Sequence, residues 1–294
     1  MPSSPSSSAQ AARRRLGEQL RQLRVAAHIS GVAFGRAAGW ADASTVSKIE
    51  KAQRTITADH VRLWCRICEV SEQRTAALLA EHADVAGMWV TYQQLNQGGL
   101  TRAQQAVRTR YERLRLMCSY QSRGFPGLLQ TEAYALGVLK GVWDEQRVND
   151  ADRETDIAAA VAERMDRQSV LHRPGKRFVH VMEESAVRNR TLPPDVHRKQ
   201  ILHTLEVMGL PSVTFGVIPL DADRVGLRPR ETFIITDGKA VNIELVSGYL
   251  TVTHPTEVEM YAGVFDRLLA LAVHGERCRD LLRDALDDLG EQQP

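Results

Sequence analysis

The stretch from Ile29 to Ala52, ISGVAFGRAAGWADASTVSKIEKA, constrains the fold of this chain more than any other. Ser30 is a good N-cap residue, and the isoleucine before it can pack on Phe34 as a hydrophobic staple. Gly39 can adopt the left-handed geometry that ends a helix, and Asp42 can cap a second helix. The stretch therefore predicts a short helix, a tight turn and another short helix.

The second of these helices, at about residues 42–51, has an apolar and a polar face. Val46 and Ile49 are spaced to point into a core. Small hydrogen-bonding groups and lysines on the outer face of such a helix suit insertion into the DNA major groove. We therefore predict two sets of DNA contacts. The residues that contact base edges are Ala43, Ser44, Ser47 and Lys48, and those that contact phosphates are Arg36, Lys51 and Arg54.

The predicted base contacts differ in chemistry. Lys48 matches the O6 and N7 acceptors of guanine, whereas the hydroxyls of Ser44 and Ser47 are nearly indifferent to base identity. Ala43 could contact a thymine methyl group. Lys48 is therefore the residue from which we expect sequence preference.

The same stretch resembles the Cro/phage-repressor (XRE) class of helix-turn-helix proteins. Gly35, the turn at Gly39-Trp40 and the run from Val46 to Glu50 (VSKIE) fall where that class has its pattern. The resemblance implies that the loop carrying Arg54 runs along the DNA backbone. The turn is one residue longer than usual, with Ala41 as the insertion, so a base-facing register shifted by one residue is the alternative.

Further helices are predicted on both sides of this pair. Leu16, Leu20, Leu23 and Ala27 form one apolar stripe over residues 16–28. Thr57 and Ser71 are N-cap residues for a fourth and a fifth helix. We therefore predict a five-helix, lambda-repressor-like domain over residues 13–87.

The chain begins with a Ser/Pro/Ala-rich segment, residues 1–12, which we predict to be a disordered arm. The basic run Arg13 to Arg15 follows. It is either a solvated helix start or an arm that touches phosphates or the minor groove.

Composition limits the class of protein. The chain has 294 residues, which suggests about two domains. Residues 1–90 carry 12 basic and 8 acidic side chains and the remainder 26 and 28, so the N-terminal part suits a polyanion better. We expect a cytoplasmic protein, because there is no signal-peptide pattern, no apolar run long enough for a membrane span, and four scattered cysteines. Cys65 and Cys68 form a CxxC without a second pair, and we predict core cysteines and no metal site.

Gly98-Gly99 marks a break, and we predict a linker over residues 88–101. The helix that follows, about residues 102–116, could pack on the first domain, bridge the domains or help a dimer form. Beyond it, apolar patterns predict helices at about 150–171, 194–208, 258–272 and 279–289, and strands at 178–182, 213–218, 233–235 and 241–246. Asp237-Gly238 is a hairpin signal between the last two strands. We expect an α+β, mostly helical chain, whose C-terminal domain (102–294) has a small antiparallel or mixed sheet with helices on one face.

The C-terminal part carries several motifs in order. Phe125 to Ala135 (FPGLLQTEAYA) looks like the PGLLQT hallmark of a C-terminal domain found in many actinobacterial XRE regulators. Further matches are Ala162 to Gln168, Glu183 to Arg188, Val213 to Leu220 and Asn242 to Glu244. That family has long been labelled as of unknown function, and some members are called antitoxin-like. The resemblance implies an architecture and a homodimer, but it does not identify the signal to which the domain responds.

The C-terminal part has no catalytic or cofactor-binding motif, and we predict neither catalysis nor a cofactor. Glu183, Arg188 and Glu244 are either polar anchors for a ligand or partner, or ion-pairing and capping groups. Residues 125–131 could form a pocket wall or a packed turn. Arg164 and Arg167 could bind an acidic group, or belong to a solvated helix face.

These patterns predict a sequence-specific transcription regulator that binds double-stranded DNA, and the family resemblance implies that it does so as a homodimer. Its C-terminal domain would sense a small molecule or a small partner protein, or would dimerise. The alternative is an antitoxin-like module that sequesters a small partner protein and binds DNA for autoregulation. A third class, an enzyme fused to a helix-turn-helix, lacks any catalytic constellation.

Overall fold

The computed structural model describes residues 8–40, 42, 44–96, 98–146 and 152–290. The chain divides into two compact units, residues 1–90 and residues 91–294. Each unit has its own hydrophobic core, and each is described by itself.

The first unit is helical, as predicted. Its described residues form five helices, namely α1 (Ser8–Ala26), α2 (Gly31–Ala37), α3 (Ser44–Glu50), α4 (Ala58–Ile67) and α5 (Glu72–Gly87). Three of the predicted N-caps are confirmed, because the hydroxyls of Ser30, Thr57 and Ser71 accept hydrogen bonds from the backbone N–H three residues later. Local capping hydrogen bonds therefore determine where α2, α4 and α5 begin.

The first helix begins earlier than predicted. Residues 8–12 belong to α1, so the prediction of a disordered arm is wrong for them, and residues 1–7 lie outside the described residues. Ala12 is buried, and packing of this face against the unit explains why the helix extends to Ser8. The side chains of Arg13 to Arg15 are exposed on the same helix rather than on a free arm.

The core of the first unit is built around aromatic rings. The rings of Phe34 and Trp64 lie 4.3 Å apart between centroids, and Trp40 packs against both. Ile29 packs on this cluster, as expected of a staple residue, and Val46 and Ile49 of α3 are fully buried in it. The apolar face of α3 is therefore turned inward as predicted.

A glycine sets how closely α1 and α3 approach. A Cβ atom on Gly17 would lie 2.4 Å from the carbonyl oxygen of Glu50, which is closer than atoms can approach without displacement. Gly35 is also buried, in α2, but the contact at Gly17 was not predicted from the sequence. The end of α3 therefore rests directly on the backbone of α1.

The second unit is built on a mixed sheet. Strand order is β1-β7-β6-β5-β2-β3-β4-β8, where β2, β3 and β4 run parallel and β5, β6, β7 and β8 pair antiparallel with their neighbours. The strands are β1 (Trp89–Thr91), β2 (Leu116–Gln121), β3 (Arg177–Glu183), β4 (Val213–Ile218), β5 (Phe233–Thr236), β6 (Ala240–Leu245), β7 (Gly248–Val252) and β8 (Val273–His274). The predicted hairpin is confirmed, because Asp237 and Gly238 both have positive φ between β5 and β6.

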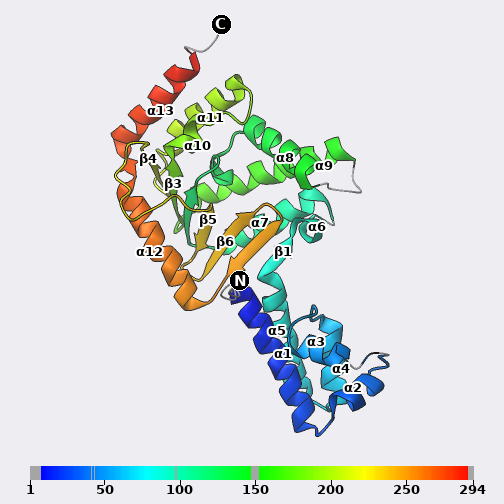
Figure 1. The fold of residues 1–294 in the computed structure, drawn as a ribbon. Helices are drawn as coiled ribbons and strands as arrows, with labels where there is room; N and C mark the ends of the chain where they lie inside the picture. The colour runs from blue at the N-terminus through cyan, green and yellow to red at the C-terminus, as the bar shows by residue number, and fades with distance from the viewer. Residues whose placement is uncertain (1–7, 41, 43, 97, 147–151, 291–294) are drawn as a thin grey trace. The chain divides into compact units, whose positions relative to one another are not determined.

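Helices pack on both faces of this sheet (Figure 1), so the expectation of one covered face is wrong. The helical segments are α6 (Tyr92–Leu95), α7 (Gly99–Arg113), η1 (Gly127–Leu129), α8 (Glu132–Gln146), α9 (Arg153–Asp166), η2 (Arg167–His172), α10 (Glu184–Arg188), α11 (Pro194–Val207), α12 (Pro255–Leu271) and α13 (Gly275–Gly290). Phe265 and Leu268 of α12 pack with Val181 on one face, whereas Leu282 of α13 packs with Phe178 on the other. The reason is that the central strands alternate apolar residues on both sides, so that each face needs its own cover.

The predicted boundary region differs most from the structure. Residues 88–101 are not an unstructured linker, because they contain β1, α6 and the start of α7, and Tyr92 is buried. The helix predicted at 102–116 ends at Arg113, and the next residues form β2, which sequence analysis missed. The helix predicted at 150–171 is α9 followed by the 3-10 helix η2.

Candidate functional site

The first candidate site is the outer face of α3. The Asp42 carboxylate accepts hydrogen bonds from the backbone N–H of Ser44, at 2.7 Å, and from its hydroxyl. Both bonds lower the pKa of Asp42, and the bond from the Ser44 hydroxyl has the larger effect. Asp42 thus supplies the charge and the acceptor that the first turn of the helix requires, as predicted.

Three of the four residues predicted to touch base edges, Ser44, Ser47 and Lys48, lie on this helix. The side chain of Lys48 is exposed, and those of Ser44 and Ser47 are partly exposed, while Ala43 and the inserted Ala41 lie outside the described residues. The Lys48 ammonium is 3.9 Å from the Asp42 carboxylate, and both side chains are more than half exposed. An exposed pair of this kind contributes little to stability, so Lys48 is free to exchange Asp42 for another acceptor.

The residues predicted to touch phosphates flank α3. Arg36 on α2, and Lys51 and Arg54 after α3, all have exposed side chains. The loop after α3 has a defined geometry, because the N–H groups of Ala52 and Gln53 donate to carbonyl oxygens of the last helical turn at 2.9 and 2.8 Å. This arrangement, with Ala52 at a φ of 51°, is a Schellman cap. The cap therefore fixes the backbone conformation around Lys51.

A buried ion pair joins the inner face of α3 to α1. Arg24 of α1 donates from Nε to Oε1 of Glu50 at 2.6 Å and from Nη2 to Oε2 at 2.9 Å. Its Nη1 also donates to the carbonyl oxygen of Ile29, at 2.8 Å. The hydrogen bond with Glu50 raises the pKa of Arg24. This pair was not predicted from the sequence, although Glu50 shares the inner face of α3 with Val46 and Ile49, where a charge requires a partner.

The second candidate site is a cavity of about 200 Å³ within the second unit. Its walls come from α7, from the segment 125–130, from α9 and η2, and from the strands β5 to β7. The polar lining residues are Tyr92, Asn96, Gln104, Tyr111, Gln121, Gln130, Arg164, Arg167, Thr232, Asn242, Glu244 and Tyr249. The segment 125–131 therefore serves both predicted roles, because Leu128 and Leu129 are packed in the core while Gly127 and Gln130 line the cavity.

Two arginines line this cavity, so of the two alternatives for Arg164 and Arg167 the solvated helix face is wrong. Arg167 is 5% exposed and Arg164 is partly buried. Both donate to Oε1 of Gln104, at 3.0 Å from Arg167 and 3.3 Å from Arg164, and Arg164 also donates to Gln130 at 2.9 Å. Burial, together with the neighbouring charge of Arg167, lowers the pKa of Arg164 to about 10, and burial also lowers the pKa of Arg167.

Comparison with known families assigns both units. Residues 15–78 match the model described as a helix-turn-helix domain, and these residues include α2, α3 and the predicted contacts with DNA. Residues 112–284, more than half of the chain, match the domain of unknown function DUF5753. The chain belongs to the DUF5753 family. No curated protein and no solved structure matches it.

The DUF5753 domain does not bring the three predicted anchor residues together. Glu183 accepts hydrogen bonds from Tyr120 and Arg224, and Arg188 pairs with Glu184 and Asp288. Both side chains are thus engaged within the fold, as expected if they are ion-pairing groups rather than ligand anchors. Glu244 differs from them, because it lines the cavity, is exposed, and accepts a hydrogen bond from Tyr92 at 2.9 Å.

The CxxC of the helix-turn-helix domain lies on α4 and its C-cap. Cys65 is buried and Cys68 is partly buried against the aromatic core, and burial raises the pKa of Cys68. Among the described helices of the chain, none is long and apolar enough to cross a lipid bilayer.

Proposed function

We propose that this protein is a sequence-specific, DNA-binding transcription regulator of the cytoplasm that acts by binding rather than by catalysis. One observation supports this most strongly. The helix-turn-helix domain presents a short helix, α3, whose inner face is buried and whose outer face carries Lys48, with the exposed cations Arg36, Lys51 and Arg54 around it.

In the proposed mechanism, α3 enters the major groove and Lys48 contacts a guanine edge. Ser44 and Ser47 hydrogen-bond less selectively, and the three flanking cations hold the domain on phosphates. Two copies of the chain bind half-sites about one helical turn, roughly 34 Å, apart. The DUF5753 domain supplies the dimer contacts, the response to a small molecule or partner protein, or both.

The test is a titration of the purified chain against its own upstream DNA and a scrambled duplex at two salt concentrations. A specificity ratio of about 10³ or more would support a regulator. Equal binding to both duplexes would contradict sequence specificity for that DNA. No binding even at low salt would contradict the proposal and favour the alternative, a module that sequesters a small partner protein.

Single substitutions separate the proposed roles. Lys48→Ala should cost about 1–3 kcal/mol on the preferred site and relax the preference at one base pair. Arg54→Ala should weaken binding to all sequences alike and reduce the salt slope by about 1. Arg62→Ala is the control, because Arg62 is an exposed cation of α4 that pairs with Asp59 outside the predicted interface. If Lys48→Ala keeps the preference unchanged, the register shifted by one residue replaces the proposed one.

A further inference from the structure

The cavity of the DUF5753 domain contains two arginines that form no ion pair with any described residue. In the described part of the chain, the hydrogen bonds of Arg164 and Arg167 inside the cavity go to the neutral amides of Gln104 and Gln130. No carboxylate of the described residues lies within ion-pair distance of either guanidinium. Other partly buried arginines of the chain, such as Arg24 and Arg224, do pair with a carboxylate.

One donor of this pair has no partner at all. The Nε–H of Arg167 is buried and makes no hydrogen bond with a described residue, and the residue as a whole is only 5% exposed. An unsatisfied buried donor on a charged group costs free energy, and a buried charge without a counter-charge costs more. The arginine is nevertheless held in place, because its guanidinium carbon lies 5.4 Å from the centre of the Tyr111 ring and its Nη1 is bound to Gln104.

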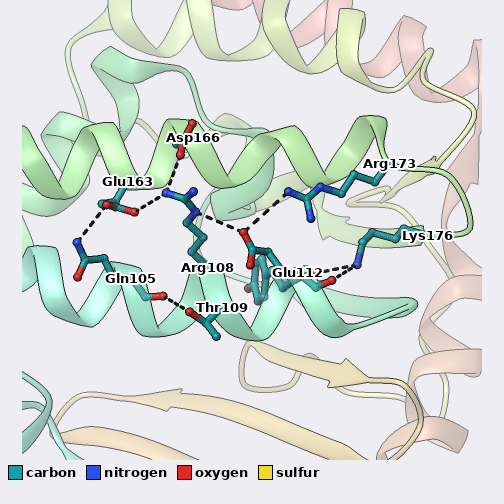
Figure 2. A network of polar contacts seen from close by, with 9 residues as sticks. Gln105, Arg108, Thr109, Glu112, Glu163, Asp166, Arg173 and Lys176 are labelled. Carbon is teal, nitrogen blue, oxygen red and sulfur yellow. Dashed lines mark hydrogen bonds and ion pairs between the residues drawn. The ribbon is translucent and has the colours of Figure 1, made fainter.

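The acidic residues of α9 are used elsewhere. Arg108 of α7 pairs with Glu163 at 3.2 Å and with Asp166 at 2.6 Å, the contacts drawn as dashed lines in Figure 2. Arg164 and Arg167 directly follow these two carboxylates in the chain, yet they line the cavity as an unpaired face. A helix packed for stability alone would have no reason to bury the unpaired face.

The segment before the arginines is shaped to accept them. A Cβ atom on Gly127 would lie 2.9 Å from Nη2 of Arg167, so a side chain there would push the guanidinium away. Glu244 bounds the cavity and its negative charge partly offsets the lowering of the Arg164 pKa by burial, but it lies beyond ion-pair distance, is exposed and accepts a hydrogen bond from Tyr92. A volume of about 200 Å³ equals roughly seven water molecules, which suits a metabolite smaller than a nucleotide.

We propose that this cavity binds a small organic anion, a carboxylate or a phosphate, through Arg164 and Arg167. Two guanidinium groups that share Gln104 as an acceptor are suited to the oxygens of either group. The bound anion supplies the counter-charge that the fold lacks. The inference rests on the proposed function for its biological role, in which this anion is the signal that the DUF5753 domain senses.

The test is calorimetric titration and thermal unfolding of the full chain with three probes at constant ionic strength. Inorganic phosphate and succinate represent the two anion classes, and succinamide is a neutral control of similar shape to succinate. We expect saturable binding and stabilisation by at least one anion and none by succinamide. Which anion binds identifies the class, and binding of neither anion would overturn the proposal.

Two variants distinguish a ligand site from a structural one. Arg167→Gln should weaken binding of the anion at least tenfold, while the unliganded protein should be as stable as the wild type or more stable, because an uncompensated charge is removed. Arg164→Gln should also weaken binding at least tenfold. Arg108→Gln removes a positive charge of α7 that is paired with Glu163 and Asp166 of α9, and it should leave the affinity unchanged.

Two results would contradict the assignment of the arginines. Equal anion affinity in wild type and in Arg167→Gln would place the bound anion elsewhere. Loss of folding in Arg167→Gln together with unchanged affinity in Arg164→Gln would show a structural role. Because these titrations contain no DNA, a failure of anion binding and a failure of DNA binding are observed separately.

Discussion

Replacing Arg24 by alanine would leave the Glu50 carboxylate buried at the end of α3 without its bidentate partner. The side chains of Arg24 and Glu50 are 12% and 6% exposed, so solvent cannot take over the lost contacts. Breaking a buried pair by removing one member typically costs about 3–5 kcal/mol. The penalty has a ceiling, because a buried carboxylate can take up a proton, and protonating an ordinary glutamate at pH 7 costs about 4 kcal/mol. We therefore expect Arg24→Ala to destabilise the first unit by about 3 kcal/mol at pH 7 and by less at pH 5.

The assay is hydrogen exchange of the full chain, read for the amides of α1 and α3. A loss of about 3 kcal/mol should lower their protection about 100-fold, while amides of the second unit keep theirs. Arg21→Ala is the matched control on the same helix, because Arg21 pairs with Glu18 at 3.2 Å while both side chains are about half exposed. It should change stability by less than about 1 kcal/mol.

The double variant Arg24→Met/Glu50→Leu tests the physical origin of the effect. Replacing both members by apolar residues should recover most of the stability, because no charge is then left buried. Equal effects of Arg24→Ala and Arg21→Ala would refute the reasoning. So would a double variant as unstable as Arg24→Ala, since packing rather than charge would then explain the loss.

Three further predictions concern single groups. Gly17→Ala should destabilise the first unit by about 1–3 kcal/mol in urea unfolding, because its Cβ would meet the Glu50 carbonyl oxygen, whereas Gly87→Ala, with open space around it, should not destabilise. Ala52→Gly should stabilise by about 1 kcal/mol, since glycine adopts the left-handed conformation without strain; an unchanged midpoint would argue against strain at this cap. Burial lowers the pKa of His180 to about 4, so the second unit should lose up to about 3 kcal/mol as the pH falls from 6.5 to 4, and His180→Gln should lose less.

Much of the first unit could be predicted from local chemistry. The hydroxyls of Ser30, Thr57 and Ser71 satisfy backbone donors within three residues, so each cap depends on its own segment. The inward positions Val46 and Ile49 follow from helical periodicity in the same way. The Arg24–Glu50 pair could not be predicted with equal ease, because its members are 26 residues apart and meet only when α1 packs on α3.

In the second unit, prediction succeeded where the signal was local. The Asp237-Gly238 turn specifies its own hairpin, because both residues tolerate the positive φ that the turn requires. The strand β2 was missed, because LMCSYQ has no β-branched residue and no clear alternation of apolar and polar residues. Its conformation follows from its neighbours, since it pairs parallel with β3 and antiparallel with β5 in the middle of the sheet.

The sequence by itself determined the five-helix unit, its outward cations and the main helices and strands of the second unit, because capping, turn geometry and apolar periodicity act within a few residues. The tertiary structure alone decided which charged residues are solvated. Arg164 and Arg167 lie beside Glu163 and Asp166 on a helix without a fully apolar side, and nothing local ranks one face above the other. Packing of α7 on α9 pairs the acidic residues with Arg108 and leaves the two arginines facing the cavity. Burial of a charge is a property of the assembled fold, and so is the site that it creates.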